Sequence, residues 1–402
     1  MINLELSKGH REIRNGLMQV SEHMIRPLSR KYDRQEHAYP KEMEDVAKLL
    51  KDARSGREKG SDSSQKAPTE GVVNAGNLGA VTGMEALCWG DAGLFLGMPG
   101  SGLGNAAINA VGTPEQVEKY GKSYAAMCIT EPGTGSDSAN ISTTAVADGN
   151  EWILNGEKIY VTDGERSDTL VVWATLDKSL GKAAIKSFIV EKGTPGCEVT
   201  RLEHKMGIRA SDTAAISFND CRIPRDNVLG SAEVATDAEG RKKAFGGVMQ
   251  TFDNTRPPVA AMAIGVARAA LDLAQELLQR EGVELQYTRK PGNSSAVEAE
   301  LYRMEADWNA ARLLVQKAAW MADNRQPNSM EASMCKAKAG RMGNYVTLRC
   351  VELCQGLGYS EEFLLEKFAR DSKILDIFEG TQQIQQLIVA RRVLGKSSSE
   401  LK

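Results

Sequence analysis

The sequence predicts a mainly α-helical protein in which a small β domain, a barrel or a sandwich, lies between two helical domains. With 402 residues, the chain is long enough for two or three packed layers. Apolar residues recur at helical spacing near both ends, whereas a central stretch is rich in β-branched and aromatic residues bounded by turns. The expected domains are an N-terminal helical domain over 1–122, a β domain over 123–231 and a C-terminal four-helix bundle over 240–396.

The N-terminal region is expected to form helices over 3–35 and 40–56, punctuated by prolines. Apolar residues at roughly helical spacing support the first helix, namely Leu4, Ile13, Leu17, Val20 and Met24. Residues 51–72 hold hardly any large apolar side chain, which predicts a mobile surface loop. Further helices fill 75–122. There Gly102–Ile108 imitates a dinucleotide-binding turn, but the preceding residues look helical, which favours helix packing through small residues.

The central stretch changes to a strand pattern. Its β-rich segments are 142–146, 152–154, 158–162, 170–173, 187–190, 198–202 and 214–218. The dipeptide Asn155–Gly156 predicts a hairpin turn between two of these strands. Helical patterning returns from about Lys242. Two apolar stripes, one over 259–270 and one over 301–315, are typical of an antiparallel bundle.

Charge and hydropathy argue against two classes of partner. The 50 basic residues are balanced by 53 acidic residues, so the chain lacks the positive field that nucleic-acid binding usually needs. No stretch approaches the roughly 18 apolar residues of a membrane-spanning helix, and no membrane insertion is expected. The first 26 residues carry acidic side chains in a helical pattern, unlike a targeting peptide. We therefore expect a cytoplasmic protein.

The cysteines and histidines give no metal-binding pattern. There are seven cysteines without a Cys-x-x-Cys pair, and four histidines that are isolated from one another in the sequence. We therefore expect reduced thiols and no metal. Cys350 and Cys354 lie one helical turn apart, where small buried hydrophobic residues are the preferred interpretation over a redox pair.

One carboxylate stands out near the C-terminus. Glu379 lies between the apolar run Ile374–Phe378 and a Gly380–Thr381 break that precedes an amphipathic helix. Apolar surroundings disfavour the charged form of a glutamate and raise its pKa from about 4.3, toward the range useful for proton abstraction. The alternative is a surface glutamate near a helix start, where carboxylates are common.

A second motif lies at Cys128–Asp137, whose glycines and hydroxyls predict a loop able to approach a planar ligand or a phosphate closely. Together with Asp253–Pro257 and Glu379–Thr381, this block resembles the acyl-CoA dehydrogenase family of flavoenzymes in order and spacing, over about residues 6–394. The resemblance implies FAD as cofactor, an acyl-CoA substrate, and an electron-transfer flavoprotein as electron acceptor. It also implies an oligomer, a dimer or a tetramer.

The resemblance assigns the chemistry to Glu379, which would remove the α proton while a hydride leaves the β carbon for the flavin. Thr255 stands where one branch of the family carries its base instead, so Glu379 is the only base expected. Arg256 matches an arginine behind the base, although a surface arginine is an alternative. The residues implied to contact substrate are Ser136, Thr255, Arg256 and Gly380.

The flavin ring would be held by residues of the two motifs and of one strand. Thr130 and Thr162 match residues that hydrogen-bond its polar edge, and Tyr160 stands where relatives usually have a tryptophan that stacks on it. Ser136 contacts either the flavin or the CoA moiety. Further contacts are implied for Thr381 and Gln383.

Departures fall in the half-site that family members lend to a neighbouring subunit through Arg-x-x-Phe and Gln-x-x-Gly-Gly-x-Gly blocks. Arg280 is followed by no phenylalanine, and the second block begins with Glu352 and keeps Gly356 but has Gln355 in place of a glycine. A carboxylate beside a pyrophosphate costs on the order of 1 kcal/mol or more. This predicts a hetero-oligomer whose partner chain supplies intact blocks, with a homo-oligomer as the alternative.

Three other functions fit parts of the pattern. An acyl-CoA oxidase would share every motif and differ in oxygen access. A nitroalkane-oxidising relative would use an aspartate as base, which Glu379 argues against. A FAD-deficient structural subunit of a heteromeric acyl-CoA dehydrogenase would explain the altered half-site, but not the retention of Thr130, Ser136 and Arg256.

Overall fold

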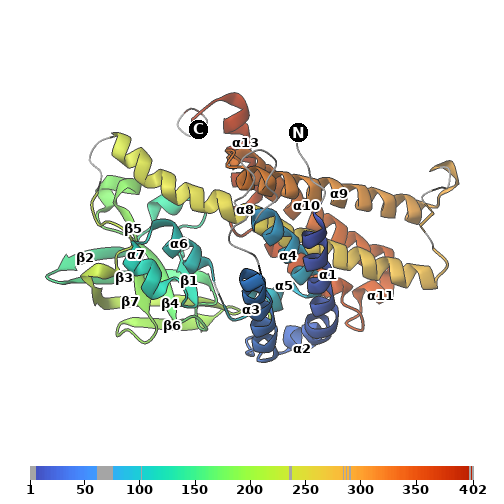
Figure 1. Cartoon of the computed structure of the whole chain (residues 1–402), viewed down its shortest axis with the longest axis horizontal. Helices are drawn as coiled ribbons and strands as arrows, with labels where there is room; N and C mark the ends of the chain where they lie inside the picture. Colours follow the sequence, from blue (N-terminus) through green and yellow to red (C-terminus); the bar gives the residue numbers. More distant parts are fainter. Residues whose placement is uncertain are drawn as a thin grey trace.

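A computed structural model describes residues 6–60, 76–100, 102–234, 238–283, 285–286, 288, 291–397 and 400; for 54–60, 238–254 and 291 it describes the backbone only. N-terminal helices are followed by a central β domain and a C-terminal helical domain, which confirms the predicted order (Figure 1). In Figure 1 the β domain lies at one end of the molecule and the helices extend away from it.

The N-terminal region is built from short helices. They are α1 (Lys8–Val20), the π turn η1 (Ser21–Ile25), the 3-10 turn η2 (Arg26–Leu28), α2 (Ser29–Arg34), α3 (Glu42–Gly60), α4 (Gly76–Gly90), α5 (Ala92–Leu96), α6 (Leu103–Val111) and α7 (Pro114–Tyr120). The single helix expected over 3–35 is interrupted near Pro27, because proline lacks the N–H that a continuous helix needs. Helix α3 continues to Gly60, so the first part of the predicted loop is helical, as its lysines, arginines and glutamate favour. Residues 61–72 of that loop lie outside the described residues.

The glycines at the start of α6 allow close packing, as predicted. A Cβ atom added at Gly102 would lie 2.4 Å from the carbonyl oxygen of Ala125, and one at Gly104 would lie 2.6 Å from that of Ala126. Helix α6 therefore rests directly on the first strand of the β domain, and Gly102–Ile108 is a packing motif.

The β domain is one curled sheet of seven strands. They are β1 (Ala125–Cys128), β2 (Thr144–Asp148), β3 (Glu151–Thr162), β4 (Thr169–Thr175), β5 (Ile185–Glu191), β6 (Cys197–Leu202) and β7 (Thr213–Pro224). The order is β1-β4-β2-β3-β7-β6, with β5 paired to β4; β4 pairs in parallel with β1 and β2, and the other pairs are antiparallel. Short 3-10 turns η3 (Ser138–Asn140) and η4 (Lys178–Ala184) lie between strands, and a third, η5 (Arg225–Asn227), follows β7.

The predicted hairpin at Asn155–Gly156 was wrong. Strand β3 runs through this dipeptide, and the turn between β2 and β3 lies instead at Gly149, which has φ 57°. Gly156 serves a different purpose, because a Cβ atom there would lie 2.5 Å from the hydroxyl oxygen of Thr143. A glycine inside a strand allows such a close approach and a register irregularity, and here β3 shifts register against β7.

The C-terminal domain is helical. Its elements are α8 (Ala238–Arg280), the 3-10 turn η6 (Pro291–Asn293), α9 (Ala296–Asp323), α10 (Ser329–Leu353), α11 (Gln355–Tyr359), α12 (Leu365–Ile374) and α13 (Gln382–Leu394). Helix α8 runs from the β domain across the helical domain (Figure 1). It starts well before Pro257, so the Thr255–Pro258 block lies inside a helix and not at its start, because the preceding residues include good helix formers such as alanine, lysine and glutamate.

The core of this domain corrects one expectation and confirms another. By length and composition Thr255–Arg280 is apolar enough to cross a membrane, contrary to the sequence analysis, but 78% of its most apolar window is buried inside the protein. It is packed as a core helix. Cys350 and Cys354 are buried in the same core, which confirms their interpretation as small hydrophobic residues, and all seven cysteines are free.

Candidate active site

The loop that carries Glu379 connects α12 to α13 in a strained conformation. Glu379 has φ 55° and Gly380 has φ 90°, both in the left-handed region that favours glycine. The fully buried Gln385 stabilises this turn, since its Nε2 donates to the carbonyl oxygens of Glu379 at 3.1 Å and Gly380 at 3.2 Å. A Cβ atom at Gly380 would lie 2.4 Å from that same Nε2. The loop therefore requires glycine after Glu379.

Residues of α10 and of the start of α13 also hold the Glu379 loop. Lys336 of α10, only 1% exposed, donates from Nζ to the carbonyl oxygen of Gly380 at 2.8 Å. Thr381 caps α13, its hydroxyl accepting from the backbone N–H of Ile384 at 3.4 Å. Gln382 donates from Nε2 to the carbonyl oxygen of Ala337 at 3.1 Å. These contacts fix the backbone on both sides of Glu379.

The carboxylate of Glu379 is enclosed although the residue as a whole is only half-buried. Thr255 donates from its hydroxyl to Oε2 at 3.1 Å, and the cations of Lys336 and Arg256 act on the same group. Burial raises the pKa of Glu379, and the Thr255 bond and the two cations only partly oppose this rise. Burial also lowers the pKa of Lys336 to about 8. The sequence-predicted residues Thr255, Arg256, Glu379 and Gly380 thus meet in one site, whereas Lys336 and Gln385 were missed.

The predicted flavin-ring residues lie on the β domain. Tyr160 is 62% exposed and has φ 56°, at an irregularity of β3 between Lys158 and Val161. The carbonyl oxygen of Thr130 accepts from the backbone N–H of Ile159 at 2.9 Å, which places the Thr130 loop beside Tyr160. Thr162 is half-buried and Ser136 is exposed. An exposed aromatic ring held in a strained conformation next to hydroxyl groups fits a planar, partly polar ring.

A buried ion pair anchors the loop of Thr130, and sequence reasoning missed it. Lys158 on β3 is fully buried and donates to Oε1 of Glu131 at 2.8 Å and to the carbonyl oxygen of Ile129 at 3.0 Å. Glu131 also accepts from the backbone N–H of Thr143 at 2.9 Å and from its hydroxyl at 2.6 Å. Burial opposes ionisation of Glu131, but the hydrogen bonds from Lys158 and Thr143 outweigh it and its pKa is lowered. Glu131 lies within the motif itself, whereas its partner is 27 residues away.

A second buried network fixes α12, the helix before the base. The Nζ of Lys367 pairs with Asp91 at 2.6 Å and with Asp371. The other oxygen of Asp371 accepts from the backbone N–H of Ile208 at 2.6 Å, in the segment between β6 and β7. The network joins α12 to the N-terminal helices and to the β domain, so it sets the position of the base relative to both.

Three of the predicted residues do not reach this site. Arg280 is exposed at the end of α8 and pairs with Glu276 at 2.6 Å, and Gly356 is exposed on α11. Figure 1 shows α11 and the C-terminal end of α8 on the far side of the helical domain from the β domain. Gln383 is exposed on α13, close in sequence to the base. Cofactor binding by Arg280 and Gly356, in this chain or in a neighbouring subunit, stays a prediction.

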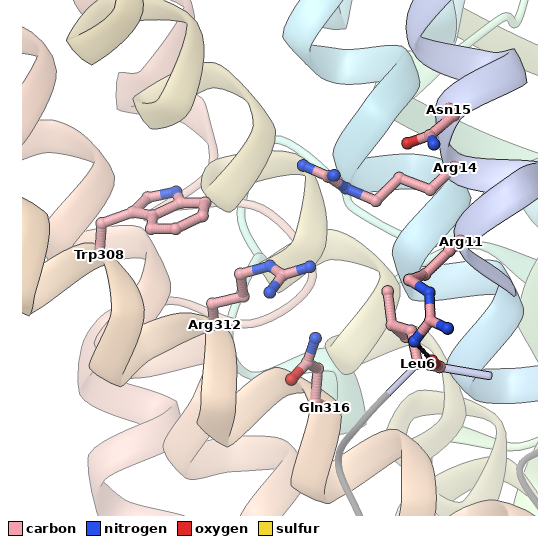
Figure 2. Close-up of a pocket in the computed structure, with 7 residues that line it drawn as sticks. All are labelled: Leu6, Arg11, Arg14, Asn15, Trp308, Arg312 and Gln316. Atoms are coloured by element: carbon pink, nitrogen blue, oxygen red, sulfur yellow. Dashed lines mark hydrogen bonds between the residues drawn. The ribbon is translucent and has the colours of Figure 1, made fainter. Parts of the chain in front are cut away.

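A separate cavity of about 510 Å³ lies between α1 and α9 (Figure 2). It is lined by Leu6, Arg11, Arg14, Asn15, Trp308, Arg312 and Gln316. Beside it, Glu85 accepts two bonds from the Nε of Arg312, at 2.7 and 2.9 Å. None of the sequence-predicted site residues lines this cavity, so it is distinct from the Glu379 site.

Comparison with known proteins identifies the chain's relatives. Residues 126–221 match the middle domain of acyl-CoA dehydrogenases and residues 245–394 match their C-terminal domain. Acryloyl-CoA reductase (NADH) of Anaerotignum propionicum is 36% identical over 296 residues, 72% of each chain. The caffeyl-CoA reductase-Etf complex subunit CarC of Acetobacterium woodii is 35% identical over 76% of this chain and 79% of that one. The mitochondrial short-chain specific acyl-CoA dehydrogenase of Bos taurus is 35% identical over 70% of this chain and 67% of that one.

Comparison with solved structures points to the same family. The structure of butyryl-CoA dehydrogenase from Megasphaera elsdenii superposes with a TM-score of 0.83 at 29% identity, over 98% of this chain and all of that one. Family members typically bind FAD. With matches over both domains and a full-length structural relative, the chain is an oxidoreductase that belongs to the acyl-CoA dehydrogenase family.

Proposed function

We propose that the protein dehydrogenates an acyl-CoA thioester between its α and β carbons, with Glu379 as the base and FAD as the cofactor. The observation that carries this proposal is the enclosed Glu379 carboxylate, whose pKa is raised and whose loop is held by Lys336 and Gln385. Family membership supplies the reaction class, and the site supplies the group that performs it.

Glu379 must be ionised to accept the α proton, and it must also be basic enough to take it. The raised pKa makes Glu379 more basic, while the Thr255 hydroxyl and the cations of Lys336 and Arg256 favour its ionised form. FAD, when bound, accepts the hydride from the β carbon. Thr130, Thr162 and Tyr160 would hold the flavin ring, with further contacts from Ser136, Thr381 and Gln383.

The reverse reaction is the second candidate, because two relatives are named as reductases of unsaturated acyl-CoA thioesters. The same residues serve in that direction, since a protonated Glu379 donates a proton to the α carbon. The raised pKa of Glu379 keeps a larger protonated fraction near neutrality and supports this role. One relative is named as part of a complex with an electron-transfer flavoprotein, and we propose such a carrier as the electron partner here.

The test is anaerobic mixing of the FAD-loaded protein with a panel of saturated acyl-CoA thioesters while flavin absorbance is followed. We expect bleaching with at least one thioester, and its loss in Glu379→Gln with flavin content unchanged. Glu362→Gln, on an exposed turn, is the matched control. A Glu379→Gln rate above a tenth of the wild-type rate would refute the assignment of the base. Peroxide release in air would indicate an oxidase, and failure to bind FAD would indicate a structural subunit.

A further inference from the structure

We propose that Glu36, His37 and His204 bind a divalent transition-metal ion of the zinc type where the N-terminal helices meet the β domain. Glu36 and His37 follow α2, and His204 follows β6, so two segments far apart in sequence supply the ligands. One potential ligand atom from each side chain lies within 4.8 Å of the other two. The sequence analysis expected no metal because these histidines are isolated from each other along the chain.

The distances are close to those of a formed site. Nδ1 of His204 lies 3.0 Å from Oε2 of Glu36, and the rings of His37 and His204 are 5.0 Å apart at 58°. Ligand atoms bound to one tetrahedral zinc ion at about 2.0–2.1 Å are roughly 3.3 Å apart. The Glu36 and His204 atoms, which share a hydrogen bond in the structure, are close to this spacing, so a bound ion would take the place of the proton between them. His37 has to approach by at most roughly 1.5 Å.

The surroundings of His37 support its assignment as a metal ligand. Among the described residues, neither of its two buried ring nitrogens has a hydrogen-bond partner, which is rare for buried polar atoms. Its backbone is also held at φ 69°, a conformation that is uncommon for non-glycine residues.

The surroundings orient the ligands. The second oxygen of Glu36 accepts from the backbone N–H of Lys205 at 2.7 Å, which orients the carboxylate with Oε2 toward His204. The ammonium of Lys205 donates to the carbonyl oxygen of Ser211 at 2.7 Å, and Arg166 pairs with Asp212 at 3.3 Å, so both neighbouring cations have partners of their own. Two imidazoles and one carboxylate select zinc, cobalt or nickel over magnesium or calcium. A bound ion would join the N-terminal helices to the β domain.

The experiment is calorimetric titration of the chelator-treated protein with zinc chloride, with the melting temperature as a second measurement. We expect one ion per chain at micromolar affinity and a higher melting temperature with zinc. His204→Gln changes an exposed residue, and it should weaken binding at least tenfold and abolish the thermal shift. His37→Gln should do the same. The control is His23→Gln on η1, which should behave as wild type, since His23 hydrogen-bonds to Gln19 at 3.2 Å and is not one of the proposed ligands.

Zinc also binds cysteine thiolates, and Cys197 is a half-buried cysteine of the β domain, so it is tested as an alternative ligand. Cys197→Ser should leave the affinity unchanged. Cobalt bound to the wild-type protein should lack the intense sulfur-to-metal absorption of a thiolate site. The proposal is overturned if the wild-type protein shows no saturable zinc binding at micromolar concentration, or if His204→Gln binds as tightly as wild type.

Discussion

Lys336 of α10 donates a hydrogen bond to the carbonyl oxygen of Gly380, the residue after the proposed base, over 2.8 Å. The buried ammonium therefore does two things at once. It holds the loop in its strained turn, and it places a positive charge near the Glu379 carboxylate, where it opposes the rise in pKa that burial causes. We regard Lys336 as a positioning residue for the base.

Lys336→Met should shift the pH dependence of the reductive half-reaction. Without the ammonium, the pKa of Glu379 rises further, so the rate should reach its plateau at a higher pH than in wild type. Lys338→Met is the matched control on the same helix, because Lys338 pairs with Asp307 at 2.6 Å. Stopped-flow flavin reduction across pH gives the profiles. An unmoved ascending limb in Lys336→Met would show that Lys336 acts on the fold alone.

The stabilities of the wild type and of Lys336→Met should depend differently on pH. Burial lowers the pKa of Lys336 to about 8 in the folded protein from the ordinary lysine value of 10.5, so between these values the unfolded chain binds more protons. Burial of the charged form destabilises the wild type below pH 8, and this penalty disappears as pH rises. Relative to Lys336→Met, the wild type should therefore gain stability from pH 8 to 10.5, by up to about 3 kcal/mol. Urea denaturation at several pH values measures the difference, and a constant difference would contradict the assignment.

Glu379 could be singled out from the sequence, but the residues that hold its loop could not. Glu379 stands out because an apolar run precedes it and a glycine follows it. Lys336 and Gln385 lie in helices where, without the fold, a lysine and a glutamine resemble ordinary surface residues. The Asn155–Gly156 prediction failed for a related reason, since packing against Thr143 decides the conformation there. Local patterns predicted the helical and β segments, whereas contacts between distant segments decided the rest.

Gly380→Ala should disable the base loop. The added Cβ would lie 2.4 Å from Nε2 of Gln385, and an alanine at φ 90° is strained as well. We expect a loss of at least tenfold in the rate of flavin reduction with little change in flavin content. Gly16→Ala in α1 is the control, because a Cβ there meets nothing within 4 Å. Equal rates in the two variants would show that the turn tolerates a side chain.

Breaking the Glu131–Lys158 pair should loosen the loop of Thr130. Glu131→Gln leaves the fully buried Lys158 without a charged partner, and loss of one member of a buried pair costs about 3–5 kcal/mol. Thermal unfolding should show a lower melting temperature, and flavin should dissociate faster. The double variant Glu131→Gln with Lys158→Met should recover part of the loss, because no unpaired charge remains. Additive losses would mean that the two residues act independently.

The flavin content of the isolated chain tests the effect of the exposed Glu352. This carboxylate pairs with Arg349, which also lies 3.3 Å from Glu300. The sequence predicts that it lies beside the flavin pyrophosphate of a neighbouring subunit. We expect the chain expressed alone to bind flavin weakly, and Glu352→Gln to strengthen binding roughly fivefold, as removal of about 1 kcal/mol of repulsion implies. Glu118→Gln, exposed on α7, should have no effect. Co-expression with a related chain that carries intact blocks should restore about one flavin per pair of chains. A homo-oligomer that holds one tightly bound flavin per chain and reduces it with acyl-CoA would refute the hetero-oligomer, because it would show that Glu352 and Gly356 serve the neighbouring subunit as they stand.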